Sequence, residues 1–256
     1  MIGVERGEDG IALVTIDNPG ARNAMTFAMW DALRDHARAL DADPAVRVVI
    51  FVGAGGAAFV CGTAISEFRD FGAEDGIAYE RRMDAVMDAL EAIRVPTIAA
   101  IAGACTGGGV AIAATCDLRI GAEDARIGVP IARTLGNCLA MGNLARVADI
   151  IGADAAKALV LTGRMLSAAQ ALQAGFLTEV VPSPAELLPR ALAQAGELLA
   201  LAPLTLRATK EGIRRLRAAR TLPSSDDLVR ACYGSADFRE GVEAFLAKRA
   251  PRWQGR

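Results

Sequence analysis

The 256-residue sequence contains a single histidine, His36, and no Cys-x-x-C pair. A structural zinc site or a histidine-dependent catalytic pair would therefore lack its usual residues, and we expect no bound metal. The cysteines are odd in number and widely separated, which does not predict a disulfide framework. They are Cys61, Cys105, Cys116, Cys138 and Cys232.

The sequence also lacks a run of basic residues and a long apolar run. Its net charge is -2 and its Lys and Arg residues are dispersed, so it does not predict a surface that binds nucleic acid. No apolar segment reaches membrane-spanning length, and the N-terminus has no basic segment followed by an apolar core. We therefore expect a soluble cytoplasmic protein. With 53% hydrophobic residues, the chain can form one large core and a smaller helical region.

Apolar segments of strand length alternate with helical sequence. Residues 11–16 (IALVTI) and 46–52 (VRVVIFV) are β-branched, and the second is too apolar for a solvated edge. Thr26 is expected to cap an intervening helix, whose apolar residues recur at three and four. His36 neighbours that stripe, and we interpret it as a structural residue. Further strands are predicted at residues 96–102, 117–120 and 178–181, and a helix at residues 71–94.

This alternation predicts an α/β fold with a mainly parallel sheet covered by helices. From Pro203 the sequence is helical and basic through Arg217, and after a break at residues 222–225 a helix is predicted from Ser224 to Lys248. We therefore divide the chain into a core at residues 1–200 and a C-terminal helical region at residues 201–256. The second region is expected to form a lid or an oligomer contact.

Two glycine-containing turns follow predicted strands, at residues 59–65 (FVCGTAI) and 106–109 (TGGG). Glycine lets a backbone approach a ligand closely, and the first N–H groups of a helix have no intrahelical acceptor. Two converging N–H groups can form an oxyanion hole. Close packing of a helix on a sheet is an equally good explanation of either turn taken alone. Nucleotide binding is disfavoured, because neither G-x-x-x-x-G-K-[ST] nor G-x-G-x-x-G is present there.

A series of motifs extends over nearly the whole chain. In order these are DNPGARNAM (17–25), AFVCGTAISEF (58–68), PTIAAIAGACTGGG (96–109), CD (116–117), LTG (161–163), SAAQA (167–171), AGFL (174–177) and FLAKRAP (245–251). Several of these motifs are weak alone, but the ordered set resembles the enoyl-CoA hydratase/isomerase superfamily, also called the crotonase family. The resemblance implies a spiral of repeated strand-strand-helix units with a C-terminal helical region. It also implies a homotrimer or a dimer of trimers.

The resemblance further implies an acyl-CoA thioester as ligand, with CoA as part of the substrate and no separate cofactor. By motif position, the backbone N–H groups of Thr63 and Gly108 would be the two oxyanion donors. Each could contribute ~3 kcal/mol to an enolate-like transition state. The Thr63 hydroxyl would then project toward the acyl group or into nearby packing.

The resemblance also implies CoA contacts. These match Ala21, Arg22, Thr63, Ala64, Ile65, Ser66, Phe245 and Lys248. Gly20 departs from the pattern, because a basic residue commonly stands there, so Arg22 and Lys248 become the expected phosphate partners. Lys248 is equally well explained as an exposed cation at a helix end.

Two acids of the family's hydratases are missing from this sequence. Family hydratases use two glutamates to activate water and deliver a proton, and the matching positions here are Ala111 and Ile131. The stretch at residues 137–141, where related isomerases and dehalogenases carry an acid, contains none either. General acid-base help contributes ~100-fold to 10,000-fold, and neither Ala nor Ile supplies it. We therefore predict weak or absent hydratase activity and an apolar acyl pocket.

Few other side chains offer replacement chemistry. Glu80 either reaches the acyl pocket or lies on a solvated face beside Arg81 and Arg82, and its charged neighbours favour the solvated face. Arg133, Thr134 and Asn137 could hold a substrate carboxylate or a water, although an ion pair is the preferred role for Arg133.

The cysteines near the glycine turns, Cys61, Cys105 and Cys138, are expected to be packing residues. We expect Asp117 to be structural.

Three functional hypotheses remain. The first is an enzyme that stabilises a thioester enolate without the hydratase acids, for decarboxylation of a malonyl-type thioester or for isomerisation. The second is an enoyl-CoA hydratase or isomerase with an acid from elsewhere, such as Glu80. The third is a non-catalytic acyl-CoA-binding protein.

Overall fold

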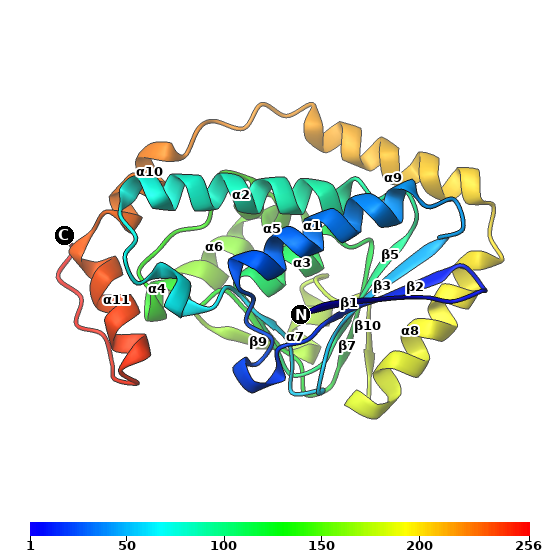
Figure 1. Cartoon of the computed structure of the whole chain (residues 1–256), viewed down its shortest axis with the longest axis horizontal. Coiled ribbons are helices and arrows are strands. Elements are labelled where there is room, and N and C mark those ends of the chain that lie inside the picture. The colour runs from blue at the N-terminus through cyan, green and yellow to red at the C-terminus, as the bar shows by residue number, and fades with distance from the viewer.

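Ten strands form two sheets (Figure 1). The computed structural model describes all residues from 1 to 256. The six-stranded sheet contains, in spatial order, β1 (Ile2–Arg6), β2 (Ile11–Ile16), β3 (Val48–Gly53), β5 (Thr97–Ile101), β7 (Leu118–Ala122) and β10 (Glu179–Val181). The four-stranded sheet contains β4 (Ala58–Cys61), β6 (Ala104–Thr106), β8 (Arg126–Gly128) and β9 (Met165–Ser167). Only the pairs β1–β2 and β8–β9 are antiparallel, so the predicted mainly parallel sheet is confirmed.

The chain repeats a strand-strand-helix unit. The pairs β3 and β4, β5 and β6, and β7 and β8 each place their first strand in the larger sheet and their second strand in the smaller one. Helices α2 (Ala73–Glu91), α3 (Gly108–Thr115), α4 (Ile131–Thr134) and α5 (Met141–Ile151) follow these pairs. This confirms the expected spiral, and it places the loops that follow β4 and β6 beside each other.

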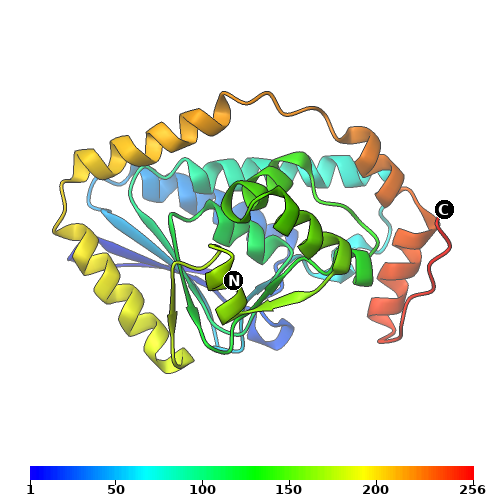
Figure 2. The same cartoon turned by 180° about the vertical axis from the view of Figure 1, so that it is seen from behind.

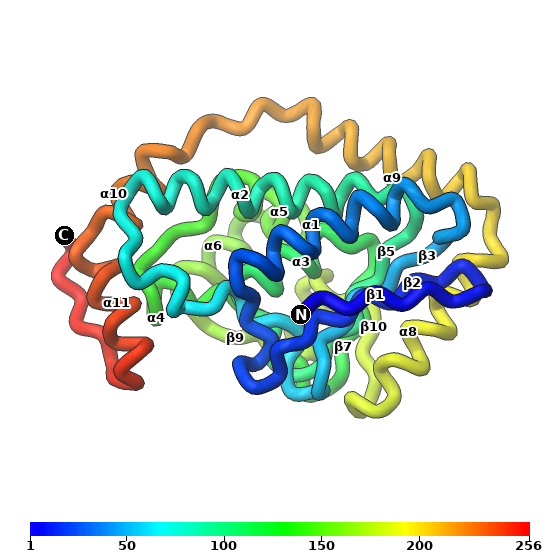
Figure 3. Tube along the Cα trace, in the orientation of Figure 1, coloured from blue at the N-terminus to red at the C-terminus, as the bar shows by residue number.

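Helix α1 (Phe27–Ala42) begins as the sequence predicts. The Thr26 side chain accepts a hydrogen bond from the Met29 N–H at 3.3 Å, which satisfies a donor of the first turn. The buried face of α1 carries Met29, Trp30, Leu33, Ala37 and Leu40. This face packs into the main core, and α1 lies along α2 (Figure 3).

The remaining helices cover the sheets and close the core. They are α6 (Ala153–Thr162), α7 (Ala168–Gln173) and α8 (Pro184–Leu199), with short 3-10 helices η1 (Pro19–Ala21) and η2 (Ile65–Phe68). Helix α8 packs on the six-stranded sheet and closes a second apolar cluster with Ile50, Ile98 and Ile120.

The C-terminal region arches over the body of the molecule (Figure 2). It contains α9 (Pro203–Ala218), α10 (Asp226–Tyr233) and α11 (Ala236–Leu246). The continuous helix predicted from Ser224 is wrong, because Gly234 ends α10 and the Ser235 hydroxyl caps α11 by accepting the Phe238 N–H at 2.9 Å. No helix in the chain combines the length and apolar character needed to cross a membrane.

Candidate active site

The two glycine turns lie against each other. Gly62 follows β4 with φ of 69°, and Gly107 precedes α3 with φ of 53°, so both adopt the left-handed conformation that favours glycine. A Cβ atom added to Gly62 would lie 3.5 Å from the Gly108 nitrogen. The predicted turns are therefore in contact through their backbones.

The N–H groups of Thr63 and Gly108 are left outside the local hydrogen bonding. Met25 donates to the Gly62 carbonyl and accepts from the Ala64 N–H, both at 2.8 Å, so the intervening Thr63 N–H faces away from this pairing. The first intrahelical hydrogen bond of α3 joins the Ala111 N–H to the Gly107 carbonyl. The Gly108 N–H lies before this bond and has no acceptor within the helix. Such free donors at adjoining turns can stabilise a negative charge.

The Thr63 hydroxyl points into protein packing. It accepts a hydrogen bond from Trp30 Nε1 at 2.9 Å and shares another with the Tyr79 hydroxyl at 2.7 Å. The Trp30 ring also contacts the other turn, because a Cβ atom on Gly108 would lie 2.7 Å from its Cζ2. Trp30, a buried residue of α1, therefore supports both turns.

The two positions that lack an acid lie in the main hydrophobic core. Ala111 follows Gly108 by one turn of α3 and is 5% exposed, and Ile131 begins α4 and is 8% exposed. Both pack in the cluster that contains Trp30. The surroundings of these two positions are therefore apolar.

Glu80 does not lie on a solvated face, so the preferred interpretation of this residue is wrong. Its side chain is buried between α2 and α10, and Oε1 accepts a hydrogen bond from the Tyr233 hydroxyl at 2.6 Å. Burial, the largest cause, and the negative charge of Asp84 together raise the pKa of Glu80 to about 7, although hydrogen bonds from the Tyr233 hydroxyl and the Ala140 backbone oppose the shift.

The spacing of apolar residues in α2 indicates that Glu80 is buried, and the sequence interpretation missed this signal. Glu80 falls on the apolar stripe formed by Ile77, Met83 and Met87, which are all buried. A charged residue on such a stripe is either turned inward or paired. Its partner Tyr233, 153 residues away, gives no comparable local signal.

The residues expected to bind CoA fall into two groups. Ala64, Ile65 and Ser66 lead into and begin η2, which contacts α11, the helix that ends just before Lys248. Phe245 and Lys248 are exposed at its C-terminal end.

The second group is the early loop with Ala21 and Arg22, which lies apart from the tip of α11 in Figure 1. Both residues are exposed, and the loop is held by Asn23, whose Nδ2 donates to the carbonyls of Ala54 and Ala58. Neither Arg22 nor Lys248 forms an ion pair, so both cations are free to meet an anion.

Two polar residues considered in the sequence, Asp117 and Thr134, have structural roles. Asp117 accepts hydrogen bonds from the Thr97 N–H and hydroxyl and from Lys210 Nζ, which ties α9 to β5. Thr134 donates to the Pro130 carbonyl at 2.9 Å. Arg133 is exposed without an ion pair, so the expected salt bridge does not form within the chain.

The thiols of Cys61, Cys105 and Cys116 are suited to packing. Burial raises the pKa of Cys116 to about 12 and that of Cys105 well above its usual value, so both thiols remain protonated at neutral pH. Burial also raises the pKa of Cys61. No group of three or more His, Cys, Asp and Glu side chains is arranged to hold a metal ion.

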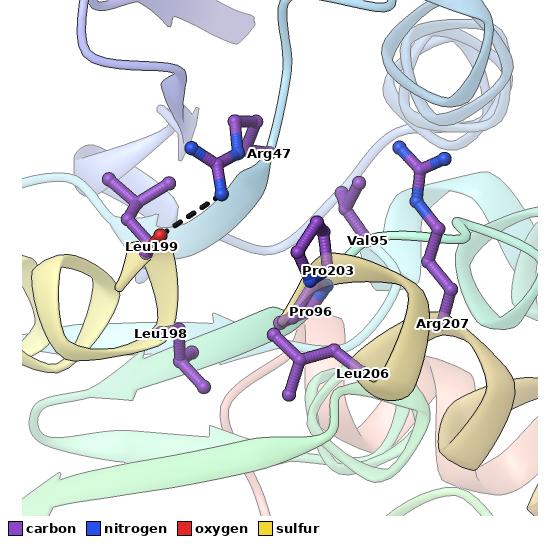
Figure 4. A pocket seen from close by; sticks show the side chains of 8 residues that line it. All are labelled: Arg47, Val95, Pro96, Leu198, Leu199, Pro203, Leu206 and Arg207. Atoms are coloured by element: carbon purple, nitrogen blue, oxygen red, sulfur yellow. Dashed lines mark hydrogen bonds between the residues drawn. The ribbon is translucent and has the colours of Figure 1, made fainter. Parts of the chain in front are cut away.

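A small cavity of about 20 Å³ lies away from the glycine turns, where the end of α8 meets the start of α9 (Figure 4). Arg47 crosses its edge and donates to the Leu199 carbonyl at 3.0 Å. Val95, Pro96, Leu198 and Pro203 contribute much of its lining, and its volume suits no more than a water-sized group. This cavity is a packing gap between α8 and α9.

Comparison with known proteins places this site in a family. Residues 6–256 match the family model described as enoyl-CoA hydratase/isomerase. A probable enoyl-CoA hydratase of Mycobacterium tuberculosis is 34% identical over 256 residues, which cover 99% of this chain and 97% of the relative.

Solved structures agree with this relationship. An enoyl-CoA hydratase/carnithine racemase from Magnetospirillum magneticum has a TM-score of 0.81 and 34% identity, covering 100% of this chain and 96% of the other. A methylmalonyl-CoA decarboxylase in complex with 2-nitronate-propionyl-CoA has a TM-score of 0.89 and 26% identity, covering 100% and 98% of the two chains. The chain belongs to the enoyl-CoA hydratase/isomerase family.

Proposed function

We propose that this protein is an acyl-CoA enzyme that stabilises a thioester enolate with the backbone N–H groups of Thr63 and Gly108. The observation that carries the proposal is the pair of N–H groups left outside the local hydrogen bonding on two touching turns. A thioester oxygen bound there gains negative charge as the neighbouring carbon loses a proton or a carboxylate. Fixed donors that meet this charge lower the barrier without reorganisation.

Hydration of an enoyl thioester fits this site poorly. The positions of the two family glutamates are occupied by Ala111 and Ile131, whose buried side chains can neither hold a water nor transfer a proton. Decarboxylation of a malonyl-type thioester, or isomerisation of an unsaturated one, demands less from side chains. The likeness to a methylmalonyl-CoA decarboxylase complex supports this class, because a nitronate is a planar anion like an enolate.

The charged ends of CoA have two candidate partners. Arg22 and Lys248 are exposed and free of ion pairs, and Ile65 and Ser66 begin the short helix that contacts α11. We assign the pantetheine to the segment from Ala64 to Ser66 and the phosphates to the two cations. Ala21, which precedes Arg22, and Phe245, three residues before Lys248, complete the assigned contact set.

We also propose a homotrimer or a dimer of trimers, with the region at residues 201–256 as lid and subunit contact. Helix α9 supports the proposal because none of its residues is buried, although it exposes Leu204, Ile213 and Leu216. An exposed apolar helix face of this kind is typical of a subunit interface. Analytical ultracentrifugation would test it, and a monomer at micromolar concentration would contradict it.

The direct test of the enolate is hydrogen exchange in heavy water. The protein is incubated with saturated, enoyl, malonyl-type and hydroxyacyl CoA thioesters, and every mass is followed with time. We expect deuterium at the carbon beside the thioester, or loss of carbon dioxide from the malonyl-type compound. Retention of one thioester without any mass change would instead indicate a binding protein. Efficient hydration of crotonyl-CoA would contradict the proposed loss of hydratase chemistry.

A further inference from the structure

Glu80 is the only acidic residue of the chain that is buried. Its carboxyl group forms no ion pair with Lys, Arg or His, whereas the buried Arg146 lies within ion-pair distance of three carboxylates. Burying a carboxyl group without a cation is costly, so structural carboxylates are usually paired or exposed. The environment of Glu80 therefore indicates a role other than an ion pair.

Helix α2 connects this carboxyl group to the glycine turns. The preceding residue, Tyr79, shares its hydroxyl hydrogen bond with Thr63 at 2.7 Å. Tyr79 packs both against the main core, which contains Ala111 and Ile131, and against the aromatic cluster, which contains Tyr233. Burial and the negative charge of Glu80 both raise the pKa of Tyr79, so the carboxyl group lies near the hydroxyl group that contacts Thr63.

Tyr233 fixes the direction of the hydrogen bonds around Glu80. Asn137 Nδ2 donates to the Tyr233 hydroxyl oxygen at 3.1 Å, and an amide nitrogen can only donate. The single proton of Tyr233 is therefore available for Glu80 Oε1, at 2.6 Å. No protein side chain donates a hydrogen bond to the second oxygen, Glu80 Oε2, and the Ala140 backbone N–H also lies near the carboxyl group.

The position of Tyr233 is tightly constrained. Its ring is fully buried, and its centroid lies 4.7 Å from that of the Phe238 ring, with the two ring planes tilted by 52°. A Cβ atom on Gly76 would lie 2.4 Å from Tyr233 Cγ, so α2 and α10 meet at this glycine without room for a side chain. The C-terminal helical region therefore contributes a fixed residue to the site.

No cation faces the Glu80 carboxyl group among the groups that influence it. Asp84 lies on the same helix, Tyr79 and Tyr233 present hydroxyl groups, and Cys138 approaches from the loop before α5. With a pKa raised to about 7 by burial, Glu80 is present in both protonation states at neutral pH. General acid-base catalysis is most effective under this condition.

We propose that Glu80 is a catalytic residue that transfers the proton in this enolate chemistry, and that Tyr233 is its positioning residue. The inference rests on the proposed function. Glu80 Oε2 takes a proton from the carbon beside the thioester, and the C–H electron pair forms the enolate double bond. The displaced carbonyl electron pair resides on the oxygen held by Thr63 and Gly108. The proton returns to the same carbon, or in isomerisation to the carbon two bonds further along.

The test is deuterium exchange into butyryl-CoA, measured from pH 5 to 9 with Glu80→Gln and Tyr233→Phe. Gln keeps an oxygen that accepts from Tyr233 but cannot take a proton, so we expect exchange to fall ~100-fold or more while the Kd for butyryl-CoA stays unchanged. Glu74→Gln, at an exposed carboxylate of the same helix, is the matched control and should exchange at the wild-type rate.

Tyr233→Phe tests whether the Tyr233 hydroxyl positions Glu80 or whether the ring only packs against its neighbours. Wild-type exchange should rise with pH to a plateau above about 7, because the ionised carboxylate is the base. Removal of the Tyr233 hydroxyl withdraws a hydrogen bond that favours the ionised form, so the midpoint should move to higher pH. An unchanged midpoint would overturn the role of Tyr233, since a purely structural change does not shift it.

The outcomes distinguish the two proposals. If Glu80→Gln exchanges at the wild-type rate and removal of the Gly108 N–H abolishes exchange, the role of Glu80 is overturned and the enolate proposal stands. Absence of exchange in the wild-type protein would overturn the role of Glu80, and it would overturn the enolate proposal as well if the malonyl-type thioester also failed to lose carbon dioxide. Thermal unfolding of each variant shows whether the chain remains folded.

Discussion

The glycine turns and the buried pair of Glu80 and Tyr233, called here the Glu80 corner, are the two parts of the candidate site. The sequence specifies them in different ways. The turns use backbone N–H groups, and their glycines mark the positions where the chain bends and comes close to itself. The Glu80 corner uses a side chain whose properties depend on Tyr233, 153 residues further along. Local sequence therefore indicates the donors, whereas only the folded chain defines the acid.

The largest effect is expected when one of the two N–H donors is removed from the glycine turns. Gly108→Pro deletes the N–H at the first position of α3, where proline suits the backbone. Because loss of one such donor costs ~100-fold to 1,000-fold in kcat, we expect a decrease of that order in exchange or decarboxylation.

Gly108→Ala is the control for this variant. Any side chain at this position meets the Trp30 ring, since Cβ would lie 2.7 Å from Cζ2, but alanine keeps the N–H. An equal decrease in both variants would assign the loss to crowding and not to the missing donor.

The Glu80 corner can be tested through stability. The pKa of Glu80 is about 7 in the folded chain and near 4.5 when it is exposed, so the folded form binds more protons between these values. Stability should therefore fall as pH rises from 5 to 8, by at most about 3 kcal/mol. Glu80→Gln should lose this component, which urea unfolding at pH 5 and pH 8 would measure. Equal pH dependence in both proteins would contradict the raised pKa.

The fold was largely predictable because its signals are local. Residues 11–16 form a strand with the predicted bounds, and Thr26 caps α1, since β-branched runs and cap residues act over a few positions. The C-terminal helices were less predictable. The chain breaks at Gly234 and Ser235 between two amphipathic helices. Their apolar residues continue one helical periodicity, which predicts a single helix.

The candidate site was only half predictable for the same reason. Motif order indicated Thr63 and Gly108, and the structure places Gly62, the residue before Thr63, against Gly108. The inward direction of Glu80 depends on the close approach of Tyr233 at Gly76, which pairs positions that are far apart in sequence. Glu80 and Tyr233 lie on different helices, so no local stretch of sequence contains both. The charged neighbours of Glu80 therefore led to the wrong prediction of a solvated face.

The threonine of the first turn offers a finer test of how the donors are held. Thr63→Val keeps the shape but removes the acceptor for Trp30 Nε1 and the partner of Tyr79, leaving buried polar groups unsatisfied. We expect a loss of about 1–3 kcal/mol in unfolding free energy and a smaller decrease in kcat than for Gly108→Pro. Thr63→Ser retains the hydroxyl and should stay close to wild type. A Val variant as stable as wild type would show that these hydrogen bonds do not support the turn.

The smallest effect is expected at the exposed cations. Arg22→Ala and Lys248→Ala should each raise KM for butyryl-CoA about fivefold at low salt without changing kcat, because an exposed charge contact contributes about 1 kcal/mol. Butyryl-pantetheine, which lacks the nucleotide phosphates, should show no such difference. If KM for the truncated thioester rises equally, these residues act on the fold or on the acyl group. The effects of the two variants should add if each cation meets a separate phosphate.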